Sequence, residues 1–490
     1  MRRRDFLNAT LAATGSLLCR PARGAWGGAP DPTASELLLP PGVRAERVLE
    51  LFLYGGLSPF ESFYVVEGHG RSGRYAGEQF HLFEASHAEV FGGCGLPEPW
   101  LTPFGTDSAG QQVHLGPLVA PLLGRSDILG RMRVLVQRHD LEPHEAAIPY
   151  ALSGHRLGSG RLAGLGAAVQ RQALSHGDRN LGAPHSYVLY PSSEIATDNL
   201  RAASAVGLHP GSARPLSLRI SDDMTDLYRS LQRANIGSRR DAYDALVQHY
   251  AQDAARRHQA HPAAALDDYL RACGQVQAAG ALAEVLSEEA LSAVSGEACQ
   301  VSSFSTTATS MKLAAHLLTH PTSPARHVTL VDGGLIPASG GGGYDVHTAH
   351  LTDTARNLSH TLSQLASHIR RPGTSDPGLL DLDETLIVIN TEFGRTPFRQ
   401  QFSTDGTNHH PYGYATVLIG GPASSGVLGA IGEDGVARQY VTPPEARAAV
   451  LAAMGIYPFS NATFAVGDLR GISTERDGLS WLNEVVLGAG

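Results

Sequence analysis

An apolar run, Leu386 to Ile389, is followed within three residues by the carboxylate of Glu392. Uninterrupted apolar runs of this length are typical of strands buried on both faces of a sheet. Similar strand-like runs lie at 47–54, 133–136, 186–190, 216–220, 327–331 and 414–419, and amphipathic helical spacing marks 351–369 and 446–454. Strands that alternate with helices favour parallel pairing with right-handed crossovers. We therefore predict an α/β fold, a three-layer α/β/α sandwich with a mostly parallel sheet.

The composition is that of a loop-rich globular protein with a sizeable core. Of the 490 residues, 42% are apolar and 17% are charged, with 55 Gly and 29 Pro. One large domain over 43–490 accounts for this length, with a helical insertion at about 222–320, where Ala, Leu, Gln, Arg and Glu dominate. Residues 64–125 are rich in Gly, Pro and aromatic residues, and we predict them to be mainly loop. The net charge of −9 argues against nucleic acid as the main partner, because phosphate binding needs a basic surface.

The first residues resemble a twin-arginine export signal. Arg3 and Arg4 form the arginine pair, and the apolar stretch 9–18 is too short to span a membrane. We predict a signal peptide at 1–24, a linker at 25–42 and export by the Tat machinery, which leaves a periplasmic or secreted chain without a transmembrane segment. Two alternatives remain: a frayed basic N-terminus, and lipid attachment at Cys19.

Cleavage of the signal would leave three cysteines, Cys94, Cys273 and Cys299. In an oxidising compartment two of them can form a disulfide. Cys273 and Cys299 both fall in the predicted helical region, so we expect these two to pair and Cys94 to stay free.

Polar residues gather after the strand-like run at 386–389. Glu392 could be a metal ligand, and the planar guanidinium of Arg395 could hold a phosphate- or sulfate-like group. Neighbouring residues on an extended chain face opposite sides, so one of His409 and His410 would face the site, and we favour His409. A Glu392–Arg395 pair that closes a turn, and a surface histidine pair, are the simpler explanations.

Three further strand ends carry candidate residues. Asp345 and His347 are two residues apart after a glycine run, so both side chains could reach one metal ion. Near the end of the first strand, Glu61 could be a third carboxylate ligand, and Ser58 could be a nucleophile if a metal lowered its pKa. A solvated glycine-rich loop and a capping turn would explain the same residues without function.

His139 and His144 flank the end of the strand at 133–136. Local hydrogen bonding near a helix start is the simpler interpretation of both. The sequence contains no phosphate-binding GxxxxGK[ST] loop, no GxGxxG after a strand and no GxSxG nucleophile elbow.

Several motifs, taken in order, resemble a family of exported bacterial proteins called domain of unknown function 1501. They are the twin-arginine start, Gly55-Gly56-x-Ser58, His144-x-x-Ala147, Asp345-x-His347, Glu392-Phe393-Gly394-Arg395-Thr396-Pro397 and Gly-x-x-His409. The resemblance implies the alkaline phosphatase and sulfatase superfamily. It also implies an alkaline-phosphatase-like sandwich in which Asp345, His347, Glu392 and His409 hold a divalent metal such as zinc, calcium or manganese.

Two functions follow as hypotheses. The first is a metal-dependent hydrolase of small anionic phosphate or sulfate esters, with a metal that polarises the ester and Arg395 that steadies the anion. The second is a catalytically degenerate binding or assembly protein on the same fold. It is suggested because Thr407-Asn408-His409-His410 stands where relatives usually carry Arg-Asp-His-Trp, and Glu61 stands where they usually carry Asp.

Overall fold

The structure is a computed structural model that describes residues 36–489, with gaps. The gaps are 70–87, 97, 99, 157–163, 176–182, 192–214, 235–240, 243, 244, 247, 251, 254, 255, 257–278, 339, 340, 401, 404 and 460–468. The predicted signal peptide at 1–24, with Cys19, and also Cys273 lie outside the described residues. In the part of the chain that is described, no helix is both long enough and apolar enough to cross a membrane.

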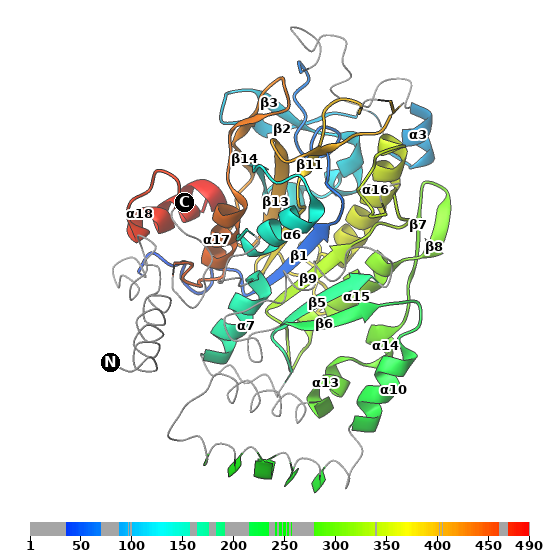
Figure 1. Cartoon of the computed structure of the whole chain (residues 1–490), viewed down its shortest axis with the longest axis vertical. Coiled ribbons are helices and arrows are strands. Elements are labelled where there is room, and N and C mark those ends of the chain that lie inside the picture. Colours follow the sequence, from blue (N-terminus) through cyan, green and yellow to red (C-terminus); the bar gives the residue numbers. More distant parts are fainter. Residues whose placement is uncertain are drawn as a thin grey trace, which may run out of the picture.

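An eight-stranded sheet forms the centre of the molecule, in the order β14-β4-β13-β10-β1-β9-β5-β6 (Figure 1). The strands are β1 (Arg47–Leu53), β4 (Met132–Gln137), β5 (Ser186–Pro191), β6 (Leu216–Ile220), β9 (His327–Asp332), β10 (Thr385–Asn390), β13 (Tyr414–Gly420) and β14 (Gly426–Leu428). The central strands β1, β9 and β10 are buried almost throughout, as their apolar runs predict. All seven predicted strands are confirmed; β14 was not predicted.

Among these eight strands, β13 alone runs antiparallel to its neighbours, β10 and β4. A parallel return would need a crossover, usually a helix. The described residues of the connection between β10 and β13 instead form two short strands, β11 (Gly394–Arg395) and β12 (His409–His410), and no helix. As a result, β13 begins at the same edge of the sheet where β1, β4, β9 and β10 end, and the segments that carry most candidate site residues meet there.

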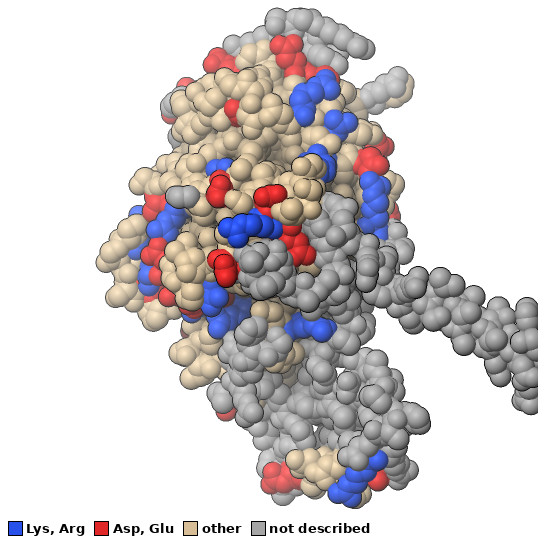
Figure 2. All heavy atoms as spheres, turned by 90° about the vertical axis from the view of Figure 1, so that its left-hand side faces the viewer, with Lys and Arg blue, Asp and Glu red and all other residues tan. Residues whose placement is uncertain are grey.

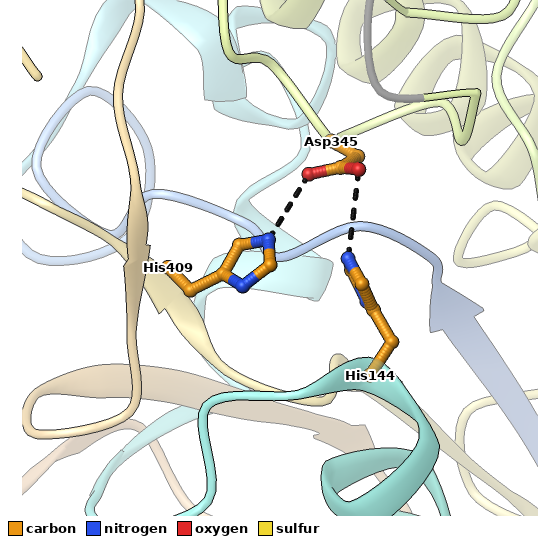
Figure 3. Close-up of side chains that lie close together, drawn as sticks. All are labelled: His144, Asp345 and His409. Carbon is orange, nitrogen blue, oxygen red and sulfur yellow. Dashed lines mark hydrogen bonds and ion pairs between the residues drawn. The ribbon is translucent and has the colours of Figure 1, made fainter.

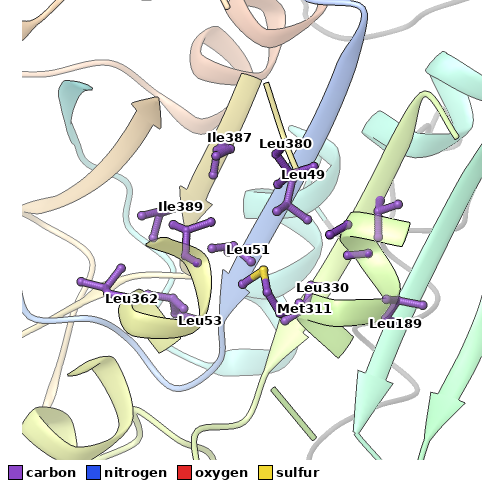
Figure 4. Packing of buried hydrophobic residues seen from close by; sticks show 14 of the residues in the cluster. Leu49, Leu51, Leu53, Leu189, Met311, Leu330, Leu362, Leu380, Ile387 and Ile389 are labelled. Carbon is purple, nitrogen blue, oxygen red and sulfur yellow. The ribbon is translucent and has the colours of Figure 1, made fainter. Parts of the chain in front are cut away.

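Helices cover both faces of the sheet and make three layers, so the predicted α/β fold is confirmed. One face packs against α4 (Ala120–Leu123), α15 (Thr306–Thr319) and α16 (His350–His368). Figure 4 shows the apolar core on this side, including Leu51, Met311 and Leu362. The other face packs against α6 (His144–Ser153), α7 (Leu165–Ser175), α17 (Pro443–Ala453) and η4 (Trp481–Leu487).

Two regions differ from the expectation. Residues 64–125, predicted mainly as loop, contain α3 (Ala88–Gly93), η3 (Pro117–Val119), α4 and the hairpin β2 (Thr102–Thr106)–β3 (Gln112–Leu115), and α5 (Ser126–Leu129) follows. The predicted helical segment contains α10 (Thr225–Ala234), α13 (Ala279–Val285), α14 (Glu288–Leu291) and α15, but also the hairpin β7 (Ser295–Ala298)–β8 (Val301–Phe304). Helix α15 packs on the sheet itself, so this part of the segment belongs to the main helical layer.

The predicted Cys273–Cys299 disulfide is wrong, because Cys299 is bonded to Cys94. Cys299 and Gln300 are the two residues of the β7–β8 turn, and both have positive φ, as the tight hairpin turns of this kind require. The bond therefore ties a hairpin tip to the segment after α3, across a sequence separation of 205 residues. A disulfide is consistent with an extracytoplasmic location.

The remaining elements lie beyond β13. They are β15 (Ala430–Ile431), β16 (Ala437–Gln439) and α18 (Glu475–Ser480). On the face turned to the left in Figure 1, the described acidic and basic side chains are intermixed (Figure 2).

Candidate metal centre

Three histidines surround the carboxylate of Asp345 at the edge where β1, β4, β9 and β10 end. His144 is the first residue of α6, His409 lies in β12, and His347 follows Asp345 in the chain. The distances to Asp345 are 3.5 Å from His144 Nε2 to Oδ2, 3.3 Å from His409 Nε2 to Oδ1, and 3.0 Å from His347 Nε2 to Oδ1. Figure 3 shows His144 and His409 pointing toward Asp345 from different segments.

A close approach between two loops fixes the position of Asp345. Gly55 follows β1 with a φ of +115°, and a Cβ on it would lie 2.1 Å from the backbone nitrogen of Asp345. The neighbouring Tyr344 donates its backbone N–H to the carbonyl of Tyr54 at 3.0 Å. Gly55 is therefore required because no side chain fits between the end of β1 and the loop that carries Asp345. At Gly56, which has a φ of +96°, a Cβ would instead lie 2.7 Å from the ring of Phe393.

The three imidazole rings are oriented in the same way. His144 Nδ1 lies 2.8 Å from Glu392 Oε1, His409 Nδ1 lies 3.1 Å from the carbonyl oxygen of Glu142, and His347 Nδ1 lies 3.1 Å from Gln400 Oε1. A neutral imidazole that donates Nδ1–H to an oxygen acceptor presents a lone pair on Nε2. Each Nε2 faces Asp345, so lone pairs and a carboxylate face one another, an arrangement that favours a cation between them.

The protonation of these groups supports the same conclusion. Burial disfavours the charged form of His144, but the hydrogen bonds that its ring donates to Asp345 and Glu392 outweigh this effect and raise the pKa of His144 to about 9. Burial also opposes ionisation of Asp345, yet His144, His409 and the Arg395 guanidinium hold its pKa well below the usual range. Without a metal, a proton on His144 takes the place that a bound cation would fill.

The ligand atoms fit a small divalent ion. One atom each of His144, Asp345 and His409 lies within 4.8 Å of the other two, so this group could hold a metal. The distances of 3.3 and 3.5 Å to Asp345 match the edge of about 3.3 Å in a tetrahedral site with bonds of about 2.0 Å. His144 Nε2 is buried and, among the described residues, faces Asp345 Oδ2 at 3.5 Å without forming a hydrogen bond of normal geometry. Two imidazoles and one carboxylate suit zinc, iron or manganese better than calcium, which prefers oxygen ligands.

Glu392 and Arg395 lie behind this group of ligands, and both are completely buried. Glu392 Oε1 accepts the N–H of Gly55 at 2.8 Å in addition to its contact with His144. Arg395 donates from Nη1 to Asp345 Oδ1 at 2.9 Å and to the carbonyl of Gly55 at 3.1 Å, and its Nη2 and Nε contact Thr407. Their contacts favour roles in orienting His144 and in holding Asp345.

Ser58 and Glu61 belong to a neighbouring buried cluster. The Ser58 hydroxyl donates to Glu61, whose Oε2 lies 3.4 Å from His350 Nε2. His350 Nδ1 lies 3.0 Å from the Thr407 hydroxyl, which also accepts from Arg395. Contacts through His350, Thr407 and Arg395 connect Glu61 to Asp345, and Glu61 is not part of the group formed by His144, Asp345 and His409.

His139 and His144, the two histidines that follow β4, make different contacts. The N–H of Leu141 donates to His139 Nδ1 at 3.0 Å, which is the local hydrogen bond expected near a helix start. His139 Nε2 also donates to the distant carbonyl of Glu392 at 2.7 Å, and burial lowers the pKa of His139 to about 4. His144 instead faces Asp345, and the sequence interpretation missed it. The signal that could have found it is its place at the first turn of a helix directly after a strand end.

No match to this chain was found among curated proteins or among solved structures. Residues 45–478 match the family model described as "Protein of unknown function (DUF1501)". This match spans β1 to α18 and includes every candidate ligand. The chain therefore belongs to the DUF1501 family.

Proposed function

We propose that this protein is an exported, metal-dependent hydrolase of phosphate or sulfate esters. The observation that carries the proposal is the convergence of His144 Nε2 and His409 Nε2 on the Asp345 carboxylate, with each Nδ1 bound to an oxygen acceptor. Carboxylate– or carbonyl–histidine pairs of this kind are characteristic of metal ligands, because the second hydrogen bond fixes the tautomer and the ring. Zinc fits the donor set best.

A divalent metal held by His144, Asp345 and His409 would polarise the ester oxygen and lower the pKa of bound water. The protein's own groups would keep that ion in place. Glu392 increases the basicity of His144, and Arg395 keeps Asp345 ionised and in position. His347, whose side chain is 34% exposed, is the histidine of the cluster that a substrate reaches most easily, and it could protonate the leaving oxygen.

Ser58 stays a prediction as the nucleophile. Its side chain is buried and its hydroxyl donates to Glu61, so a substrate does not reach it in this conformation. A water molecule at the metal is the nucleophile that we favour. Arg395 likewise stays a prediction as the anion-binding group, since nearly all its donors are used within the protein.

The burial of Arg395 and Ser58 is also the observation that favours the second function, a metal-dependent binding or assembly protein without turnover. Such a protein would keep the metal ligands but would need neither an accessible nucleophile nor an anion-binding cation.

A screen of aryl phosphates and aryl sulfates separates the two functions. We expect hydrolysis that disappears on chelation, returns with zinc, and is lost in His409→Ala. The matched control is His410→Ala, because His410 Nε2 contacts the carbonyl of Gly435 instead of Asp345. Turnover that survives metal removal would reject the metallohydrolase. A protein that binds metal but hydrolyses no ester would favour the binding function.

A further inference from the structure

A chain of polar side chains crosses the buried face of the sheet beneath α6 and α17. Thr416 of β13 donates to Asn390 of β10 at 3.1 Å, and Asn390 Nδ2 donates to Glu50 of β1 at 3.3 Å. The other oxygen of Glu50 accepts from Thr329 of β9 at 3.3 Å and lies 3.7 Å from His327 Nε2. A buried carboxylate beside the apolar residues of this face needs a compensating charge.

Arg447 of α17 is a cation that interacts electrostatically with Glu50, and it is 4% exposed. Its Nη1 donates to the carbonyl of Leu152 at 2.9 Å, but Nε and Nη2 make no hydrogen bond to any residue that the structure describes. Burial lowers the pKa of Arg447 to about 9, with the charge of Glu50 acting against this change. Arg447 thus remains a cation at neutral pH, with two donors left unsatisfied.

A cavity of about 20 Å³ lies at this position. Glu50, Arg447, Asn390, Gln137 and Thr416 supply its polar lining. This volume holds one water molecule, which needs at least about 10–15 Å³ and two to four polar partners. The charges of Glu50 and Arg447 cancel, so the lining favours a neutral occupant with both donors and acceptors over an anion.

We propose that this cavity is a binding site for ordered water that bridges the Arg447 guanidinium to the Glu50 carboxylate. The bridge would satisfy the free donors of Arg447, and it joins α17 to the centre of the sheet. Because Arg447 also holds the carbonyl of Leu152 in the last turn of α6, the same residue fixes the helix that begins with His144. The inference does not depend on the proposed hydrolase activity.

A crystal structure of the full exported chain tests the site directly. We expect density for water within about 3.2 Å of Arg447 Nε or Nη2 and on a path to Glu50. A crystal soaked in bromide distinguishes the ions, since bromide scatters anomalously and water does not. An empty cavity, a direct Arg447–Glu50 contact, or a bromide peak beside Arg447 would each overturn the proposal.

A double-mutant cycle tests the bridge in solution. Arg447→Met and Glu50→Gln should each lower the urea midpoint, and the double variant should lower it by less than the sum, because neither buried group is then left without its partner. The matched control is the exposed pair Arg131 and Asp383, changed to Met and Asn, for which we expect an additive and small effect. Additive effects for Arg447 and Glu50 would contradict the bridge. If a single variant does not fold, a double variant that folds would support the bridge, and one that does not would contradict it.

Discussion

Two buried aspartates at either end of one loop differ in how their carboxylates are completed. Asp332, the last residue of β9, accepts four hydrogen bonds at 2.6–2.8 Å, from the hydroxyls of Thr307, Tyr344 and Thr361 and from the N–H of Gly334. Asp345, at the other end of the loop, faces Arg395 and three imidazole nitrogens. The first carboxylate is complete within the protein, whereas the second is complete only with a proton or a metal ion beside it.

The loop between β9 and α16 thus carries one aspartate that holds its conformation and one that is a candidate metal ligand. The partners of Asp332 are neutral donors of the protein itself. One of them is the hydroxyl of Tyr344, which stays protonated because burial raises the pKa of Tyr344 well above its usual range. Asn357 holds the same loop by accepting from Leu335 and Ile336 and donating to the carbonyl of Gly343. Asp332 and Asn357 thus build the loop, and Asp345 uses the position that they provide.

The largest expected effect is on metal affinity. Asp345→Asn should weaken zinc binding by more than about 100-fold, because it removes the only charged ligand of the group. Titration calorimetry on the metal-free protein measures this. Asp332→Asn should leave the affinity almost unchanged, and equal losses in the two variants would remove the distinction between them.

The second effect is on stability, and here Asp332 rather than Asp345 is the important residue. Asp332→Asn should lower the free energy of unfolding by about 3 kcal/mol, because an amide cannot accept from all four donors and leaves buried groups unsatisfied. Urea unfolding of the metal-free protein measures the loss. A change below about 0.5 kcal/mol would show that Asp332 is not the anchor of this loop.

Glu392→Gln tests the layer behind the ligands. We expect metal affinity to fall by about 10–100-fold, less than for Asp345→Asn, since Glu392 acts through His144. His139 provides the comparison, because its hydrogen bond with Glu392 is to the backbone carbonyl and not to the carboxylate. His139→Gln should therefore bind metal normally. A loss for Glu392→Gln as large as that for Asp345→Asn would make Glu392 a ligand, as the sequence suggested.

The smallest effect is the pH dependence from His139. Its pKa is lowered from 6.5 to about 4 by burial, so the native state binds fewer protons than the unfolded state. This contribution to stability is complete above pH 6.5 and is lost as the pH falls toward 4. Urea midpoints between pH 4 and 7 should fall less steeply in His139→Gln than in the wild type. Identical slopes would contradict the assignment.

The fold was predictable because its strands are apolar runs that local pattern alone identifies. The candidate site was predictable where a residue follows a strand end, as Glu392 does. It was also predictable where the alternation of an extended chain decides which way a side chain faces, as for Asp345 and His409. The role of His144 was not predictable, because its orientation depends on Glu392, which lies 248 residues away in sequence. The disulfide prediction was wrong for the same reason. The packing of the β7–β8 hairpin decides which cysteine lies near Cys299, whereas the prediction used only the fact that Cys273 and Cys299 fall in the same region of the sequence.

The most direct test is the metal content of the purified protein, measured by elemental analysis beside Asp345→Asn and Asp332→Asn. We expect stoichiometric transition metal, with zinc favoured, in the wild type and in Asp332→Asn, and its loss in Asp345→Asn. A folded wild type without metal, or metal retained in Asp345→Asn, would contradict the assignment of this cluster as a metal centre.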